Sequence, residues 1–176
     1  MERLFFAGLK HSGKTTFASL IAKHFDIEFK DSDDLVLERI PTDSIRSFYK
    51  EFGKERFMEE EYLALDDFLS AAKCAIVALG GGASDNSKLL ELVKRNGKLI
   101  YLMRDEEDML PVILKDGIPP FLDSSSVKSS FHELYARRDR IYRENADLTI
   151  DLGPYRDINE TLSMIIQKLQ EAGYGC

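Results

Sequence analysis

The chain has 176 residues, of which 44% are hydrophobic and 31% are charged. This length and balance predict one compact domain over residues 1–176 and exclude a disordered chain, and the lack of a repeat excludes a solenoid. The formal charge of −7 argues against nucleic acid as a main partner, because proteins that bind the phosphate backbone usually carry the opposite sign.

The longest apolar runs, residues 4–9 and 75–79, are far shorter than the roughly 20 residues that a membrane span needs. The N-terminus also lacks the basic and then apolar layout of a signal peptide. We therefore expect a cytoplasmic protein without a membrane partner. We also expect a monomer. Because the only cysteines are Cys74 and Cys176, we expect neither a disulfide framework nor a zinc site, and any metal should be bound through oxygen.

Short β-like runs alternate with helix-like stretches in the first half of the chain. The run over residues 3–9 precedes an apolar helical pattern that begins near Gly13. A second short strand, residues 27–29, leads into an acidic cluster and a polar helical region that breaks near Pro41. The next long helix is expected over residues 53–72.

The second half continues this alternation. The expected elements are a strand over 74–79, a helix that Gly97 ends, a strand over 98–103, a short helix and a turn-rich flap within 109–126, a helix over 127–145, a strand over 147–152 and a helix over 158–169. Five strands separated by helices predict a parallel sheet with helices on both faces, which is a three-layer α/β fold. Ligands on such a sheet bind at the carboxyl ends of the strands.

A phosphate-binding motif follows the first expected strand. Residues 8–15 read Gly-Leu-Lys-His-Ser-Gly-Lys-Thr and match G-x-x-x-x-G-K-[ST]. Lys14 can reach the outer phosphates of a nucleotide, and Thr15 offers a hydroxyl to Mg²⁺. The expected nucleotide-binding residues are Gly8, Lys10, His11, Ser12, Gly13, Lys14, Thr15 and Thr16. The motif therefore predicts a P-loop nucleoside-triphosphate-binding fold.

An acidic cluster follows the second expected strand, at Asp31, Asp33 and Asp34. One carboxylate of the cluster could support the Mg²⁺ shell, and another could accept a proton from a substrate hydroxyl. The alternative is a local role, in which Ser32 or Asp33 caps the following helix.

Two charged residues fall on apolar helix faces, and a run of glycines ends the third strand. Glu61 lies on the apolar stripe of the helix over 53–72, and Arg138 lies on that of the helix over 127–145. Buried charges need a partner in the protein or in a ligand. Residues 80–82 are all glycine, which allows a ligand to approach the backbone closely, although a tight turn explains them as well. Arg137, Arg140 and Arg143 are interpreted as a solvated face.

These segments together resemble the shikimate kinase family, small P-loop kinases that phosphorylate one hydroxyl of a cyclic polyhydroxy acid with ATP and Mg²⁺. The resemblance covers nearly the whole chain, through the phosphate loop, residues 29–33, Gly53 with Phe57 and Glu61, residues 79–82 and residues 138–142. It implies a substrate-binding region at about 33–62 and a lid at about 111–126. The resemblance also implies that Lys14 and Thr15 bind the phosphates and the metal, with support for the metal from Asp31. It implies that Asp33 activates the hydroxyl and that Arg138 contacts the carboxylate of the acceptor. The residues implied to line the acceptor pocket are Glu61, Gly80, Gly81 and Gly82.

Two positions depart from the pattern of the family. Where members carry an arginine after the phenylalanine, this chain has Met58, and where the lid arginine is expected it has Pro119. Neither side chain can donate a charge-assisted hydrogen bond, so we expect weak binding of shikimate and slow phosphorylation. Three alternatives stay open: a catalytically weakened ATP-binding module, a kinase for another small polyol acid, and a nucleotide kinase.

Overall fold

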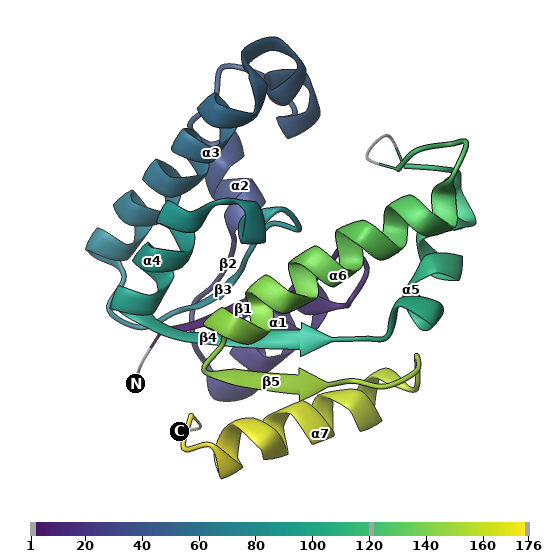
Figure 1. Cartoon of the computed structure of the whole chain (residues 1–176). Helices are drawn as coiled ribbons and strands as arrows, with labels where there is room; N and C mark the ends of the chain where they lie inside the picture. Colours follow the sequence, from purple (N-terminus) through teal and green to yellow (C-terminus); the bar gives the residue numbers. More distant parts are fainter. Residues whose placement is uncertain (1–2, 120–121, 175–176) are drawn as a thin grey trace.

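The computed structural model describes residues 3–119 and 122–174 and has a five-stranded sheet at its centre (Figure 1). The strands are β1 (Arg3–Ala7), β2 (Phe29–Asp31), β3 (Ile76–Ala78), β4 (Gly97–Met103) and β5 (Leu148–Asp151). Their order in the sheet is β2-β3-β1-β4-β5, and each neighbouring pair is parallel. The expected parallel α/β sheet is therefore confirmed.

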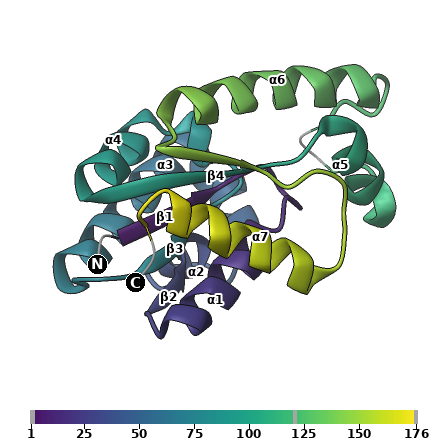
Figure 2. The ribbon, with the colours of Figure 1, turned by 90° about the horizontal axis from the view of Figure 1, so that it is seen from below.

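Helices cover both faces of the sheet. They are α1 (Lys14–Phe25), α2 (Ser32–Leu37), α3 (Ile45–Ala71), α4 (Ser87–Asn96), α5 (Glu106–Ile113), α6 (Val127–Asn145) and α7 (Ile158–Glu171), with short 3-10 helices η1 (Ala83–Asp85) and η2 (Leu114–Asp116). In Figure 2, α1 and α7 lie below the sheet, whereas α6 crosses above it. The arrangement has the three layers that the sequence predicts.

Strand β1 divides the apolar core between the two faces, because successive side chains of a strand point in opposite directions. Phe5 and Ala7 pack in the cluster formed with α2, α3 and α4, whereas Leu4 and Phe6 pack in the cluster formed with α1 and α7. Phe5 and Phe6 are both 0% exposed, and full burial of such a side chain contributes about 1.5–3 kcal/mol to folding. This burial on both faces explains the continuous apolar run at residues 4–9.

Several boundaries of the first half differ from the prediction. Strand β1 ends at Ala7 rather than at residue 9, and β3 covers Ile76–Ala78 rather than residues 74–79. Strand β2 runs over Phe29–Asp31 rather than 27–29, so it includes the first residue of the acidic cluster. Helix α3 begins at Ile45 rather than at Gly53, and Gly53 forms a kink inside it with φ 82° and ψ 177°. Glycine adopts this conformation without the steric cost of a Cβ. The two helical pieces are therefore joined at the residue that was expected to begin the helix.

The segment predicted as a flap contains more helix than expected. Helix α5 begins at Glu106, three residues before the predicted start of that region, and η2 follows it. A small apolar cluster holds this segment against the loop after β1; its buried members are Leu9, Met109, Ile113, Leu122 and Phe131. Pro120 and Phe121 of the flap lie outside the described residues.

No helix within residues 3–119 and 122–174 is both long and apolar enough to cross a membrane. Cys74 is a free thiol, and Cys176 lies outside the described residues.

Candidate active site

The phosphate-binding loop occupies the carboxyl end of β1, between that strand and α1, which begins at Lys14. Two residues from distant segments hold its backbone. Arg104 Nε donates to the carbonyl of Ser12 at 3.2 Å, and the Tyr155 hydroxyl donates to the carbonyl of His11 at 2.9 Å. The Arg104 guanidinium also lies 4.1 Å from the centre of the Tyr155 ring. Sequence reasoning missed both residues, although an arginine directly after a buried strand was a signal.

The acidic cluster at the end of β2 lies against this loop. Thr15 Oγ1 donates to Asp31 Oδ2 at 3.0 Å, although the two residues belong to different elements. Asp31 Oδ1 accepts from the Asp33 backbone N–H at 2.9 Å, so Asp31 is the N-cap residue of α2. The alternative in which Ser32 or Asp33 caps this helix is therefore wrong, because the cap is Asp31. Ser32 instead accepts a hydrogen bond of 2.8 Å from the Gly80 N–H and links β2 to the end of β3.

Asp33 and Glu61 meet at Gly80. A Cβ added to Gly80 would lie 2.6 Å from Asp33 Oδ1 and 3.3 Å from Glu61 Oε1, so no larger residue fits without displacing a carboxylate. Gly81 lies against the phosphate loop, since its added Cβ would be 3.7 Å from the Lys10 nitrogen. The close approach at Gly80 gives that glycine a packing reason beyond a simple turn, whereas the distance at Gly81 is an ordinary van der Waals contact.

Burial perturbs the ionisation of the residues at this junction. Desolvation raises the pKa of Asp33, the Asp31 carboxylate raises it further, and the Lys14 ammonium opposes them. Desolvation lowers the pKa of Lys14, with Asp33 and Asp31 acting against that change and Arg138 supporting it. The phosphate-loop lysine, both aspartates and Arg138 therefore share one electrostatic environment.

Glu61 is 2% exposed, as its place on the apolar stripe of α3 predicts. Its burial raises the pKa of the carboxyl to about 7; Asp33 and Asp85 add to the shift and a hydrogen bond from Asn86 opposes it. Asn86 Nδ2 donates to Glu61 Oε2 and to the Met58 carbonyl, both at 2.9 Å. Asn86 is a further buried polar residue that sequence reasoning missed, and it ties η1 to α3.

Arg138 extends from α6 towards the triple glycine. Its Nη1 donates to the Gly81 carbonyl at 2.8 Å, and its Nη2 donates to Asp85 Oδ2 at 3.3 Å. Arg137 was interpreted as solvated, but its Nη1 lies 3.1 Å from Asp85 Oδ1. Arg143, also expected on the solvated face, donates from Nε to Asp139 at 2.7 Å. Helical spacing therefore identified Arg138, but it did not predict that Arg137 and Arg143 also have acidic partners.

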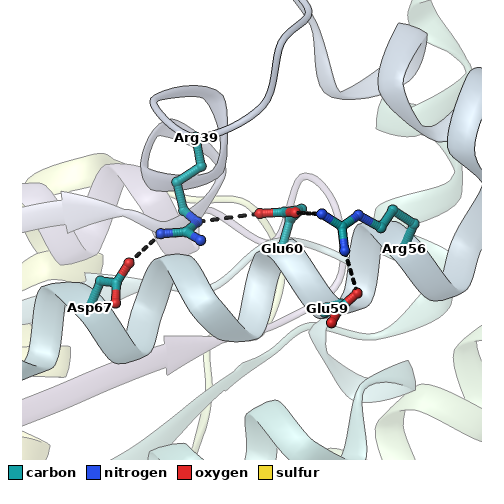
Figure 3. Close-up of polar contacts among 5 residues, drawn as sticks. All are labelled: Arg39, Arg56, Glu59, Glu60 and Asp67. Atoms are coloured by element: carbon teal, nitrogen blue, oxygen red, sulfur yellow. Dashed lines mark hydrogen bonds and ion pairs between the residues drawn. The ribbon is translucent and has the colours of Figure 1, made fainter.

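An ion-pair network on α3 occupies the arginine nearest to Met58 in the sequence. Figure 3 shows Glu60 between the guanidinium groups of Arg39 and Arg56, with Asp67 beside Arg39. Arg56 Nη1 also lies 2.6 Å from Glu59 Oε2. Both terminal nitrogens of Arg56 are thus paired, and Arg56 does not compensate for the methionine at residue 58.

Met58 lines a groove of about 690 Å³ between α3 and α4, together with Tyr62, Asn86 and Ser87. Lys14, Asp33 and Arg138 are not among the residues that line it. Cavity volume alone would therefore select a groove that these three residues do not line. We place the candidate site instead at Lys14, Asp33 and Arg138, whose charges act on one another.

Among the described residues, no three histidine, cysteine or acidic side chains come together as a possible metal site. Mg²⁺ is commonly bound by one or two protein oxygens together with nucleotide phosphates and water, so it does not require such a cluster. The Thr15 hydroxyl and the Asp31 carboxylate form a donor set of that kind.

Comparisons with known proteins agree with this geometry. A family model described as "Shikimate kinase" matches residues 10–170. A shikimate kinase from Burkholderia lata is 31% identical over 170 residues, which cover 97% of this chain and 91% of that protein.

Two solved structures have the same fold. A shikimate kinase from Acinetobacter baumannii, in complex with shikimate, superimposes with a TM-score of 0.83 and 25% identity over 98% of this chain and 94% of that one. A shikimate kinase from Aquifex aeolicus has a TM-score of 0.77 and 24% identity over 99% of both chains. The extent of the family match and the similarity of the Burkholderia protein lead to one assignment: the chain belongs to the shikimate kinase family and is an ATP-dependent kinase.

Proposed function

We propose that the chain transfers the γ-phosphoryl group of Mg·ATP to one hydroxyl of shikimate. The observation that carries this proposal is the position of Asp33: the Lys14 ammonium acts on its pKa, and its Oδ1 lies 2.6 Å from where a Cβ of Gly80 would be. An acceptor held against Gly80 would lie between the carboxylate and the phosphate loop. Residues 33–62 would bind the acceptor and residues 111–126 would form the lid. One chain would therefore form the whole site as a monomer.

Phosphoryl transfer depends mainly on positioning and charge stabilisation. In our proposal, the loop over residues 8–15 binds the nucleotide and Lys14 contacts its outer phosphates. Burial lowers the pKa of Lys14, and Asp33 and Asp31 oppose this change in part because they favour its charged form. Arg138 adds a second positive charge in the same environment. The two cations would stabilise the negative charge of the transferring phosphoryl group and the charge that develops on the leaving oxygen of ADP.

The donor set at Thr15 and Asp31 fits Mg²⁺, because a hydroxyl and a carboxylate lie 3.0 Å apart beside the phosphate loop. We propose that these two residues hold the ion. The bound ion would neutralise phosphate charge and orient the terminal phosphate. Asp31 also caps α2, so the same carboxyl fixes the helix that carries Asp33.

Asp33 is the proposed acceptor of the hydroxyl proton. A raised carboxyl pKa makes the carboxylate a stronger base, and burial together with Asp31 raises that of Asp33. Glu61, Gly80, Gly81 and Gly82 would shape the acceptor pocket beside it. Arg138 would bind the acceptor carboxylate beside Gly81, whose carbonyl accepts a hydrogen bond from its guanidinium.

A catalytically weakened module is the less favoured alternative, because Lys14, Thr15, Asp31 and Asp33 are all present and clustered. The family match likewise disfavours a nucleotide kinase.

The test is to incubate the purified protein with Mg·ATP and shikimate and to identify the product by ³¹P NMR and mass spectrometry. We expect a shikimate phosphomonoester with one equivalent of ADP. Parallel reactions with gluconate-like acids, neutral polyols and nucleosides serve as comparisons. Phosphorylation of one of those acceptors and not of shikimate would contradict the proposal.

A further inference from the structure

Three cationic side chains from two helices surround the carboxylate of Asp85, which ends η1 just after the triple glycine. Asp85 Oδ2 lies 3.3 Å from Arg138 Nη2 and 3.9 Å from Lys54 Nζ, and Asp85 Oδ1 lies 3.1 Å from Arg137 Nη1. The Asp85 side chain is 13% exposed, whereas those of Lys54 and Arg137 are 51% and 47% exposed. The most buried partner, Arg138 at 16%, is the residue proposed to contact the acceptor.

Asp85 occupies part of the guanidinium that an acceptor would need. A carboxylate binds arginine best through two adjacent N–H groups. In Arg138, Nη1 donates to Gly81 and Nη2 to Asp85, and Nε is buried without a hydrogen-bond partner in the described structure. A two-point contact through Nε and Nη2, or through Nη1 and Nη2, brings the ligand carboxylate to the nitrogen that already donates to Asp85, so the two carboxylates would lie close together on one guanidinium.

We propose that Asp85 determines specificity by competing with the acceptor carboxylate for Arg138. The inference rests on the proposed function and concerns the acid group of the same acceptor. Two carboxylates on one guanidinium repel each other, and low solvent exposure strengthens that repulsion. Asp85 therefore weakens the binding of acids and leaves the binding of uncharged polyols unaffected. This repulsion weakens acid binding in addition to the effect of Met58 and Pro119, which replace the arginines of the family pattern.

A positioning role for Asp85 gives the opposite expectation. If Asp85 served only to orient Arg138, removal of its charge would loosen the arginine and weaken the binding of an acid. If Asp85 competes, the same change frees Nη2 and strengthens that binding. Asp85→Asn is suitable for this comparison because asparagine has nearly the same shape and keeps an oxygen that can accept a hydrogen bond.

The experiment compares equilibrium binding of shikimate and its methyl ester by calorimetry, since the ester keeps the ring and hydroxyls but lacks the charge. We expect Asp85→Asn to lower the dissociation constant for shikimate about tenfold, with little change for the ester. Asp26→Asn makes the same substitution at an exposed residue outside the proposed acceptor-binding region and should alter neither constant. Thermal unfolding of each variant confirms that it is folded.

An unchanged or higher dissociation constant for shikimate in Asp85→Asn would overturn the inference, as would an equal change for acid and ester or no detectable binding to that variant. These constants do not require turnover. Failure of the wild-type protein to phosphorylate shikimate would therefore contradict the proposed function alone, while the binding comparison would still decide the role of Asp85.

Discussion

The hydroxyl of Thr15 lies 3.0 Å from the carboxylate of Asp31 and donates a hydrogen bond to it, which joins the first turn of α1 to the end of β2. Both residues lie beside the carboxyl ends of the parallel strands, where ligands of such folds bind. The pair therefore connects the phosphate loop to the acidic cluster and supports the proposed magnesium site.

Asp31→Asn should weaken the dependence on Mg²⁺ without unfolding α2. Asparagine caps a helix about as well as aspartate, but it lacks the charge that favours a divalent ion. We expect the Mg²⁺ concentration for half-maximal turnover to rise about tenfold, measured by ADP release at saturating ATP. Circular dichroism provides the folding control. An unchanged Mg²⁺ requirement would remove Asp31 from the proposed metal site.

Asp33→Asn should reduce turnover far more than nucleotide affinity. The substitution removes the proposed proton acceptor and leaves the phosphate loop intact, so we expect kcat to fall by about 10²-fold or more. The dissociation constant for ADP should change by less than about threefold. Asp26→Asn, at an exposed residue outside the proposed acceptor-binding region, serves as the surface control. Equal kcat values for the Asp33 variant and the control would contradict the role of Asp33.

Glu61→Gln should flatten the dependence of stability on pH. The carboxyl pKa is raised from 4.5 to about 7 by burial and by the carboxylates of Asp33 and Asp85, with Asn86 opposing. Because the folded state holds the proton more tightly, the resulting stabilisation is fully present below pH 4.5 and is lost as the pH rises through 7. The loss amounts to about 3 kcal/mol.

Urea unfolding of the wild type and the Glu61→Gln variant between pH 4.5 and 8 measures this difference. The wild type should lose stability relative to the variant across that range. If the free energy of unfolding of the wild type, relative to that of the variant, stayed constant or rose with pH, the raised pKa of Glu61 would be contradicted.

Met58→Arg and Pro119→Arg together should increase kcat/KM for shikimate. Each substitution restores an arginine at a position where the family carries one, and a charge-assisted contact with a carboxylate contributes roughly 2 kcal/mol. We expect kcat/KM to rise about tenfold or more. The rise should be smaller than two full contacts would give, because Asp85 still competes for Arg138. Steady-state kinetics decides the outcome. Saturation of the wild type at low shikimate concentration, with no gain in the double variant, would show that these two positions do not limit binding.

Much of the fold was predictable because its signals are local. Alternating apolar runs and the phosphate-binding motif identified the strands, the helices and the loop at Gly8 to Thr15. Glu61 and Arg138 were predictable from helical spacing, which places each on an apolar face. The start of α3 was missed although Ile45, Phe48 and Phe52 fall at helical spacing, because a glycine at residue 53 favours a helix boundary there.

The missed site residues depend on contacts between distant segments. Asp85 and Asn86 lie in or beside a short 3-10 helix, where no periodicity indicates which side chains are buried. Their partners come from α3 and α6, so their roles follow only from the assembled fold. Arg104 is similar, because its bond to Ser12 spans 92 residues.

The central claim is that nucleotide bound at the phosphate loop donates its γ-phosphoryl group to shikimate. The most direct measurement compares the rate of shikimate phosphate formation in the wild type, Lys14→Ala and Lys23→Ala, where Lys23 is an exposed lysine on the same helix. We predict that Lys14→Ala abolishes product formation with an unchanged melting temperature, because this ammonium serves the phosphates and not the core. Lys23→Ala should match the wild type. Unchanged product formation in a folded Lys14→Ala protein would contradict the claim.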